Sequence, residues 1–437
     1  MSARHLQRGS VLVLTLWLAA GLAAGALLAG HVVVLRYRRE ANRHAALCAE
    51  HAIDAGRCYV AQVLTTLASP GALPDLTAYT AADIPVGECR LWLLGRSADV
   101  NAEEPVFGLQ DEGGRLSLNE PTSQTRLEAL PGMTPELAGA IIDWRDADDI
   151  LSPDGAEAET YLARTPPSTA KNVPFETVDE LRLLNGAEAA LLDGIDRNRN
   201  TLIEPWEKRL AEQRQERFRD LPDYGLLDLL TVYSREPNLT AAGARRPNLR
   251  TMTQPELIQA VGPGAAGLDP RSLNSVLDLC LKAKLSGEAA VQAFERFSVS
   301  AQRLIPGRVN LNTASAAVLG TLPGFAGTDY AARLVAYREQ NPTGLQTPLW
   351  LREALGDEVA KTVAAAGDLV TTKSYQVTAD LVAVGPAGRA FRRTRFIFDL
   401  TTGIPVVVSR RDLTQLGWPL GEALQRELVG APGGNTL

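Results

Sequence analysis

One long apolar run near the N-terminus constrains the fold of this chain more than any other feature. Between Arg8 and Arg36 lie 27 residues without a formal charge. A helix crosses the hydrocarbon core of a membrane with about 20 apolar residues, so the run Val11–Leu35 is long enough to span one. A cleavable signal peptide has a shorter apolar core, of about 7 to 15 residues, before its small-residue cleavage site. Here the apolar run continues past the small residues 24–26.

The helical pattern extends beyond the apolar run. Small and apolar residues recur at helical spacing as far as Leu67, and proline at position 70 forbids continuation. We therefore expect one helix over about residues 10–68, with residues 10–35 in a membrane and the second half projecting from it. At 1.5 Å per residue this helix would be about 85 to 90 Å long.

A short basic leader, a glycine and a long half-apolar helix together resemble the type IV pilin-like proteins. The resemblance implies a leader over residues 1–9, cleavage after Gly9 by a prepilin peptidase, and Ser10 as the first mature residue. Ordinary members carry glutamate at the fifth mature position, where this chain has Leu14. In lacking this glutamate, the chain resembles the minor pseudopilin of type II secretion known as general secretion pathway protein K. A non-pilin anchor is the alternative explanation of Leu14.

Length and charge limit the class of protein. A chain of 437 residues predicts two or three domains, and 45% hydrophobic with 22% charged residues is a globular composition. A net charge of -7 argues against general affinity for nucleic acids or anionic lipids.

The cysteines show no C-x-x-C pair, so thiol-redox and zinc sites lack their usual spacing. They are Cys48, Cys58, Cys89 and Cys280. Export from the cytoplasm would permit disulfides. Two alternatives remain. Cys58 and Cys89 could form a bond between the helix and the first strand, or the thiols could be free and buried.

Short apolar runs bounded by turn residues predict strands on both sides of a helical region. The strands expected to pack on the projecting helix cover residues 90–94, 106–109 and 115–118, and strands return at 375–384, 392–400 and 404–409. From residue 119 to about 368 the pattern is helical, with frequent caps and Pro-Gly breaks.

The expected fold class is therefore α+β. A long N-terminal pilin helix precedes an antiparallel-sheet pseudopilin head, which covers residues 69–116 and 369–430. A large inserted all-α domain covers residues 117–368, and a tail over 431–437 is expected to be unstructured.

The helical region contains a repeated pattern, near residues 117–145, 247–285 and 309–366. In each repeat an Asn or Thr can cap a short helix, and a Gly or Pro-Gly turn ends it before a second helix. This is a helix-hairpin-helix or sterile-alpha-motif-like (SAM-like) unit. Such units often bind DNA, and Leu322–Gly324 followed by Arg333 and Arg338 resembles the DNA-uptake and repair versions.

Charge argues against DNA binding. Residues 117–160 contain ten acids and two bases, a net charge of 2 − 10 = −8, and residues 309–368 contain four bases and six acids. Binding to phosphates requires Lys and Arg facing them. We therefore expect no nucleic acid partner, and a membrane-anchored helix-hairpin-helix protein for DNA binding or uptake remains the alternative function.

Further segments are similar to successive signatures of the general secretion pathway protein K family, over essentially the whole chain. They are Asp111–Asn119, Asp143–Asp148, Pro153–Glu157, Tyr161, Asn172–Phe175, Asp179–Leu181 and Asn310–Ala314. The middle repeat at Asn248–Thr251 departs from the pattern, and residues 197–248 are longer than expected, which leaves the local fold of that stretch open.

The resemblance implies a structural role and no enzymatic reaction. Proteins of this family form the tip of the type II secretion pseudopilus with the minor pseudopilins I and J, nucleating or capping a filament that exports folded proteins across the outer membrane. It implies a single-pass inner-membrane protein with its C-terminal domains in the periplasm. Its expected partners are those pseudopilins and the inner-membrane secretion assembly platform, and it would not form a homo-oligomer.

Motifs for catalysis are missing from the sequence. There is no G-x-S-x-G elbow, no H-E-x-x-H and no Walker loop, and all four histidines lie in the leader or the long helix.

Calcium is the cofactor that the sequence favours. Residues 196–207 fit the loop pattern D-x-[DN]-x-[DN]-G-x5-E except at its glycine. The ligands would be side-chain oxygens of Asp196, Asn198, Asn200 and Glu207 and the backbone carbonyl of Leu202. Thr201 stands where the loop requires a positive φ, which is costly for a β-branched residue. A solvated capped turn is the alternative.

A second acidic cluster places six carboxylates within fifteen residues, at Asp143, Asp146, Asp148, Asp149, Asp154 and Glu157. Like charges this close are unfavourable unless a cation or solvent screens them. The family resemblance implies calcium binding in the helical domain, which supports Asp143, Asp146, Asp148, Asp154 and Glu157 as ligands. Helix capping by Asp148 or Asp149 is the alternative.

Overall fold

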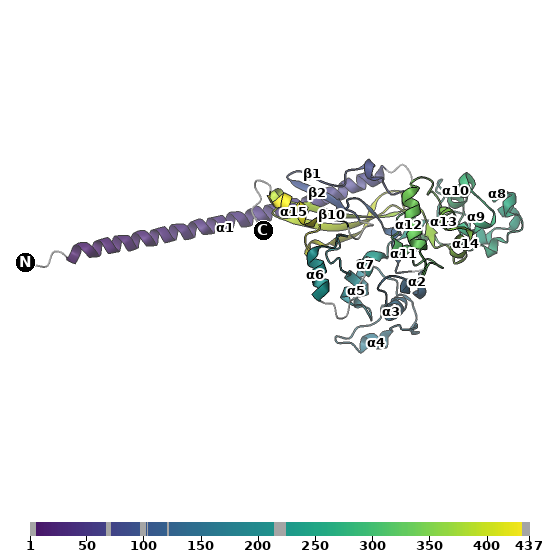
Figure 1. Ribbon diagram of the computed structural model, residues 1–437, viewed down its shortest axis with the longest axis horizontal. Helices are drawn as coiled ribbons and strands as arrows, with labels where there is room; N and C mark the ends of the chain where they lie inside the picture. The colour runs from purple at the N-terminus through teal and green to yellow at the C-terminus, as the bar shows by residue number, and fades with distance from the viewer. Residues whose placement is uncertain are drawn as a thin grey trace, which may run out of the picture.

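The long helix predicted from the sequence is α1, Leu6–Thr65, in the computed structural model (Figure 1). The structure describes residues 6–66, 71–96, 102, 104–119, 122–213 and 224–430. The first five leader residues, the predicted helix stop at 69–70, Glu120 and the predicted tail 431–437 lie outside these ranges.

The two halves of α1 have different surroundings. Every side chain from Val11 to Glu40 is exposed, whereas one face of the second half is buried by Ala45, Ala49, Ala52, Ile53, Val60 and Leu64. Among the described residues, α1 is the one helix with the length and composition to cross a membrane. The buried half lies close to the sheet, because a Cβ atom added to Gly56 would be 2.7 Å from Leu91 Cδ2.

One antiparallel sheet packs on the second half of α1. Its strand order is β1 (Ile84–Val86), β2 (Cys89–Leu94), β10 (Gln376–Val384), β11 (Phe391–Asp399) and β12 (Val406–Asp412), and β3 (Gln110–Asp111) also pairs with β10. Strands from the two ends of the chain therefore form one sheet. This sheet and the apolar helix confirm the mixed α+β class, and β2, β10 and β11 confirm three of the predicted strands.

The central strand β10 is buried along its whole length. Side chains alternate between the two faces of a strand, and Val377, Ala379, Leu381 and Ala383 share an apolar cluster with α1. On the other face Val382 and Val384 belong to a second apolar cluster, against which Leu424 and Leu428 of α15 (Gly421–Gly430) pack. The same face carries the buried polar residues Gln376, Thr378 and Asp380.

Residues 116–371 form the other helices and three two-stranded ladders. The helices are α2 (Gln124–Glu128), α3 (Pro135–Arg145), α4 (Ala158–Leu162), α5 (Ala189–Asp193), α6 (Pro205–Gln213), α7 (Leu226–Leu229), α8 (Gln254–Val261), α9 (Val276–Lys282), α10 (Gly287–Arg296), α11 (Ala316–Leu319), α12 (Tyr330–Gln340), α13 (Trp350–Leu355) and α14 (Asp357–Ala365). The ladders pair β4 (Leu116–Ser117) with β5 (Leu230–Thr231), β6 (Arg235–Pro237) with β7 (Leu304–Pro306), and β8 (Val309–Asn310) with β9 (Val370–Thr371). The expectation that residues 117–368 are purely helical was therefore wrong.

Three strand predictions need correction. Residues 106–109 make only an isolated bridge, between Phe107 and Leu94. The strand at 115–118 is the short β4, and its Leu116 and the adjacent Leu118 enter the core of the helical region and not the α1 interface. The last predicted strand begins later, at Val406. Local apolar patterning predicts a strand but does not select the core into which it packs.

The turns of the repeated pattern share one backbone feature. Gly132, Gly262 and Gly324 all have positive φ, at 76°, 102° and 81°. Only glycine adopts this conformation at low cost, so each marks a required turn. Asn and Thr were the expected caps, but the first helices of the first and third repeats are capped by Ser123 and Ser315.

Candidate metal centre

Residues 196–207, here called the Asp196 loop, fold into a turn held by their own side chains. The Asp196 carboxylate accepts hydrogen bonds from the backbone N–H groups of Asn200 (3.1 Å) and Thr201 (2.7 Å). Asn198 Oδ1 accepts from the Asn200 N–H (3.0 Å), and Asn200 Oδ1 accepts from the Leu202 N–H (2.8 Å). The predicted side-chain oxygens at the first, third and fifth positions therefore converge on one turn.

Glu207, in the first turn of α6, closes the loop from its other end. Its Oε1 accepts hydrogen bonds from the backbone N–H groups of Arg197 (2.7 Å) and Asn198 (3.2 Å), and its Oε2 accepts from that of Glu204 (3.0 Å). A carboxylate has about four lone-pair sites, so these bonds leave acceptor capacity for a cation. The spacing of the loop pattern predicted this position for Glu207. The start of α6 at Pro205 places the residue there.

The acidic groups of the Asp196 loop are buried. Asp196 is 0% exposed and Glu207 is 1% exposed. Burial raises the pKa of Asp196 to about 7, and the charges of Asp228 and Glu207 add to the effect. Burial also raises the pKa of Glu207 to about 7. A divalent cation among these oxygens would supply the missing positive charge, because carboxylate and amide oxygens are the ligands that calcium prefers.

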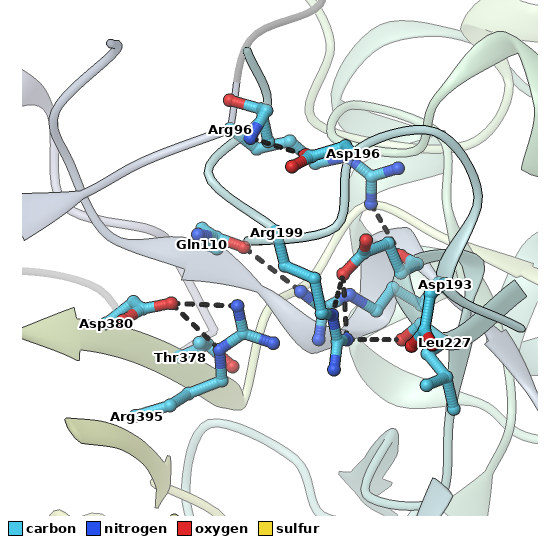
Figure 2. Close-up of polar contacts among 12 residues, drawn as sticks. Arg96, Gln110, Asp193, Asp196, Arg199, Leu227, Thr378, Asp380 and Arg395 are labelled. Atoms are coloured by element: carbon cyan, nitrogen blue, oxygen red, sulfur yellow. Dashed lines mark hydrogen bonds and ion pairs between the residues drawn. The ribbon is translucent and has the colours of Figure 1, made fainter. Parts of the chain in front are cut away.

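The loop is bound to the sheet as well as to its own backbone. Arg393 of β11 donates to the carbonyl oxygens of Asn198 and Arg199, the latter at 2.8 Å. The same guanidinium pairs with Asp380 of β10 at 2.9 Å, and Arg395 pairs with Asp380 at 2.8 Å. Figure 2 shows Arg199, which lines a cavity with Arg395, near the Asp380–Arg395 pair. Arg393 is not among the site residues predicted from the sequence, although an arginine within a predicted strand is a visible signal.

The backbone of the loop is strained where the sequence lacks glycine. Thr201 has φ of +67°, the left-handed value expected for its position. Such a conformation costs an L-residue about 1 to 2 kcal/mol.

Replacing Thr201 by glycine should stabilise the protein by up to about 1 kcal/mol, since the relief of strain exceeds the entropy lost by a more flexible unfolded chain. Calcium affinity should rise too, because the loop no longer stores that strain. Urea unfolding and calcium titration of the full-length chain measure both. Lys284→Gly, at a remote exposed residue with φ of +55°, is the control and should leave calcium affinity unchanged. Equal affinity in parent and Thr201→Gly would contradict the argument.

The second acidic segment brings some of its predicted residues together. Asp143, at 0% exposed, lies on α3 near Asp146 and Glu157. Asp143 Oδ2, Asp146 Oδ1 and both Glu157 oxygens are buried without a hydrogen-bond partner. Burial, followed by the charges of neighbouring acids, raises the pKa of Asp146 and of Glu157. Unpaired buried carboxylates are costly. These three residues are called the Asp143 cluster below.

The remaining acids of that segment lie at its margin. Asp148 accepts a hydrogen bond from the backbone N–H of Ile150 (2.9 Å), and Asp149 accepts one from Asn172 Nδ2 (2.9 Å). Asp154 is exposed and has φ of +56°. Gly155 allows the close approach of this turn, because an added Cβ atom would lie only 2.0 Å from Asp143 Oδ2.

Comparisons with known proteins place this region in a family. Residues 119–197, which include the Asp143 cluster and Asp196, match the family described as Type II secretion system (T2SS), protein K. Type II secretion system protein K from Klebsiella pneumoniae is 45% identical over 71 residues, which are 15% of this chain and 22% of that protein. The matched segment thus spans about a fifth of the relative.

A solved structure is also similar along most of the chain. It is the crystal structure of the GspK-GspI-GspJ complex from the enterotoxigenic Escherichia coli Type 2 Secretion System, with 13% identity, a TM-score of 0.40, and coverage of 89% of this chain and 99% of that chain. The family match and the Klebsiella relative show that residues 119–197 of this chain are similar to protein K of the type II secretion system.

Proposed function

We propose that this chain is a minor pseudopilin at the tip of the type II secretion pseudopilus, where it nucleates or caps the filament. The observation that carries the proposal is the division of α1, in a chain whose residues 119–197 are similar to protein K. Its first half is apolar and exposed, and its second half lies under the sheet. The same division supports a single-pass inner-membrane protein, with the head (69–116 and 369–430) and the helical insertion (117–368) in the periplasm.

The shape of the molecule supports a place at the tip. In Figure 1 the helices α8, α9 and α10 lie at the end of the molecule farthest from the N-terminus. A further subunit stacked above this chain would clash with these helices. Leu14, 63% exposed, also lacks the carboxylate expected of ordinary filament subunits.

Calcium has a structural role in this proposal. A cation in the Asp196 loop and another in the Asp143 cluster would neutralise buried carboxylates and stiffen the helical insertion. The proposed role involves no enzymatic reaction.

DNA binding finds less support. Arg338 donates to the backbone carbonyls of Leu311 (3.0 Å) and Ala314 (2.7 Å), and Arg333 donates to that of Ala354 (3.3 Å). The arginines that resemble a DNA-binding hairpin are thus engaged within the protein, in a region with more acids than bases.

Co-expression of the full-length chain with pseudopilins of the I and J types tests the proposal. We expect one heteromeric complex in size-exclusion chromatography in detergent, because the helical bulk would prevent the chain from stacking on itself. The chain alone should not form filaments. Stable homofilaments without any complex would exclude the tip role.

Processing of the leader gives a further prediction. Mature protein should begin at Ser10, because the prepilin peptidase requires a small residue before its cut. Gly9→Lys should remain unprocessed and should abolish secretion. Gly25→Ala, at a helix position with nothing within 4 Å of the added Cβ, should be processed normally. N-terminal sequencing provides the readout, and a different mature terminus would refute the leader.

A further inference from the structure

A third group of side chains that could hold a metal ion lies near the end of the head from which α1 projects. Within the part of the chain that the structure describes, His44, Cys48 and Glu88 bring one ligand atom each within 4.8 Å of one another. Imidazole nitrogen, thiolate sulfur and carboxylate oxygen are the protein ligands of zinc. None of these residues belongs to the Asp196 loop or the Asp143 cluster, so the group is independent of the calcium proposal.

Two of the ligands come from consecutive turns of α1. His44 and Cys48 are four residues apart, which places them on one face of the helix. Cys48 Sγ lies 3.6 Å from His44 Nε2 and 3.7 Å from Nδ1. Zinc bonds of about 2.3 Å to sulfur and about 2.05 Å to nitrogen, at a tetrahedral angle, separate the two ligand atoms by about 3.6 Å. The spacing therefore matches two ligands of one ion.

The third ligand is held by the hairpin of β1 and β2. Val86 and Cys89 are partners across the hairpin, so Gly87 and Glu88 form a two-residue turn, and Gly87 supplies the positive φ of 59° that such turns require. Since β2 packs on α1, the turn carries the Glu88 carboxylate beside the helix. A short turn on a packed strand holds a ligand more firmly than a long loop.

The neighbouring thiol is suited to packing and not to metal binding. Cys89 is buried, with only 2% of its surface exposed, within the apolar cluster between β2 and α1. Cys48 is only partly buried. Of the two alternatives left open for the cysteines, the structure has no Cys58–Cys89 bond: all four cysteines are free, Cys58 is exposed, and Cys48 is the thiol beside Cys89.

We propose that His44, Cys48 and Glu88 bind a divalent cation of the zinc class, with water at the fourth position. Binding converts the Cys48 thiol to a thiolate and releases its proton to solvent. The ion would link the β1–β2 hairpin to α1 at the membrane-proximal end of the head. It would thereby hold the angle between the projecting helix and the head.

Cobalt(II) titration of the reduced full-length chain in detergent, with calcium in excess, tests the site. We expect a thiolate-to-cobalt charge-transfer band that saturates at one ion per chain and disappears when zinc is added. Cys48→Ser should remove the band. His44→Ala and Glu88→Gln should each lower cobalt affinity at least about tenfold, since even the loss of an outer-shell partner weakens metal sites 10- to 100-fold.

Two control variants lie on the same helix. Cys58→Ser and His51→Ala, at exposed positions of α1, should leave the band and the affinity unchanged. The proposal is overturned if the parent shows no band, or if the band persists in Cys48→Ser. A Cys48–Cys89 disulfide in protein isolated without reductant would also overturn it, because the disulfide consumes the ligand thiol.

Discussion

Replacing Asp380 by asparagine should lower the free energy of unfolding by about 3 to 5 kcal/mol, the cost of leaving buried charges without their partner. Asp380 is 0% exposed and is the shared partner of Arg393, also 0% exposed, and Arg395. Asparagine has nearly the same shape, so the loss reports the charge and not a cavity. Urea unfolding followed by tryptophan fluorescence measures the change.

Asp83→Asn is the matched control, because it makes the same chemical change in an ion pair at the surface. Asp83 pairs with Arg90, and both side chains are about half exposed, at 50% and 51%. Exposed pairs contribute about 0 to 1 kcal/mol, so this variant should unfold close to the parent. Equal small losses in the two variants would show that the Asp380 network does not hold the head to the Asp196 loop.

The same ion pairs predict how acid acts on the protein. Burial alone would raise the pKa of Asp380, but Arg393 and Arg395 lower it to about 2. A carboxyl group whose pKa is lower in the folded state stabilises that state above its unfolded pKa of about 3.9. This contribution should be present above about pH 4 and lost as the pH falls toward 2, and Asp380→Asn should lack it.

Calcium should raise the stability of the full-length chain by about 2.7 kcal/mol for each site filled to 100 times its dissociation constant. The reason is that calcium would bind the folded loop, where Asp196 and Glu207 lie together, and not the unfolded chain. Thermal unfolding in excess chelator and in millimolar calcium measures the difference. Asp196→Ala and Glu207→Ala should weaken binding by removing an anionic ligand.

The pH dependence of this effect has a definite sign. An acid whose pKa is higher in the folded state stabilises that state below its unfolded pKa and loses this contribution as the pH rises. In chelator, stability from Asp196 and Glu207 should therefore fall between about pH 4 and pH 7. Calcium should offset the loss above pH 7, and its affinity should decrease below pH 7 as protons compete for the ligands.

Glu212→Gln provides the control for Glu207→Gln, because both lie on α6 and Glu212 is exposed. The control should keep the calcium response, and Glu207→Gln should lose the part due to the Asp196 loop. Asp143→Asn tests the Asp143 cluster separately. If chelator and calcium give the same melting curve and Glu207→Ala binds as the parent does, the loop is a capped turn and no metal site.

The sequence by itself determined the features that depend on neighbouring residues. The span Val11–Leu35, the strands around Leu91 and Leu381, and the left-handed backbone at Thr201 follow from apolar runs, period-two patterning and loop spacing. These signals are local, because a helix, a strand or a turn needs only its own side chains to favour it.

The tertiary structure decided which local features meet. Leu116 packs in the core of the helical region and not against α1. Arg393 contacts Arg199 of the Asp196 loop, which lies 194 residues earlier in the chain, and Cys48 lies beside Cys89. The four-residue spacing of His44 and Cys48 is visible in the sequence, but their partner Glu88 is not. Such pairings depend on how segments far apart in the chain pack together. A single sequence contains no local signal for which of these segments will meet.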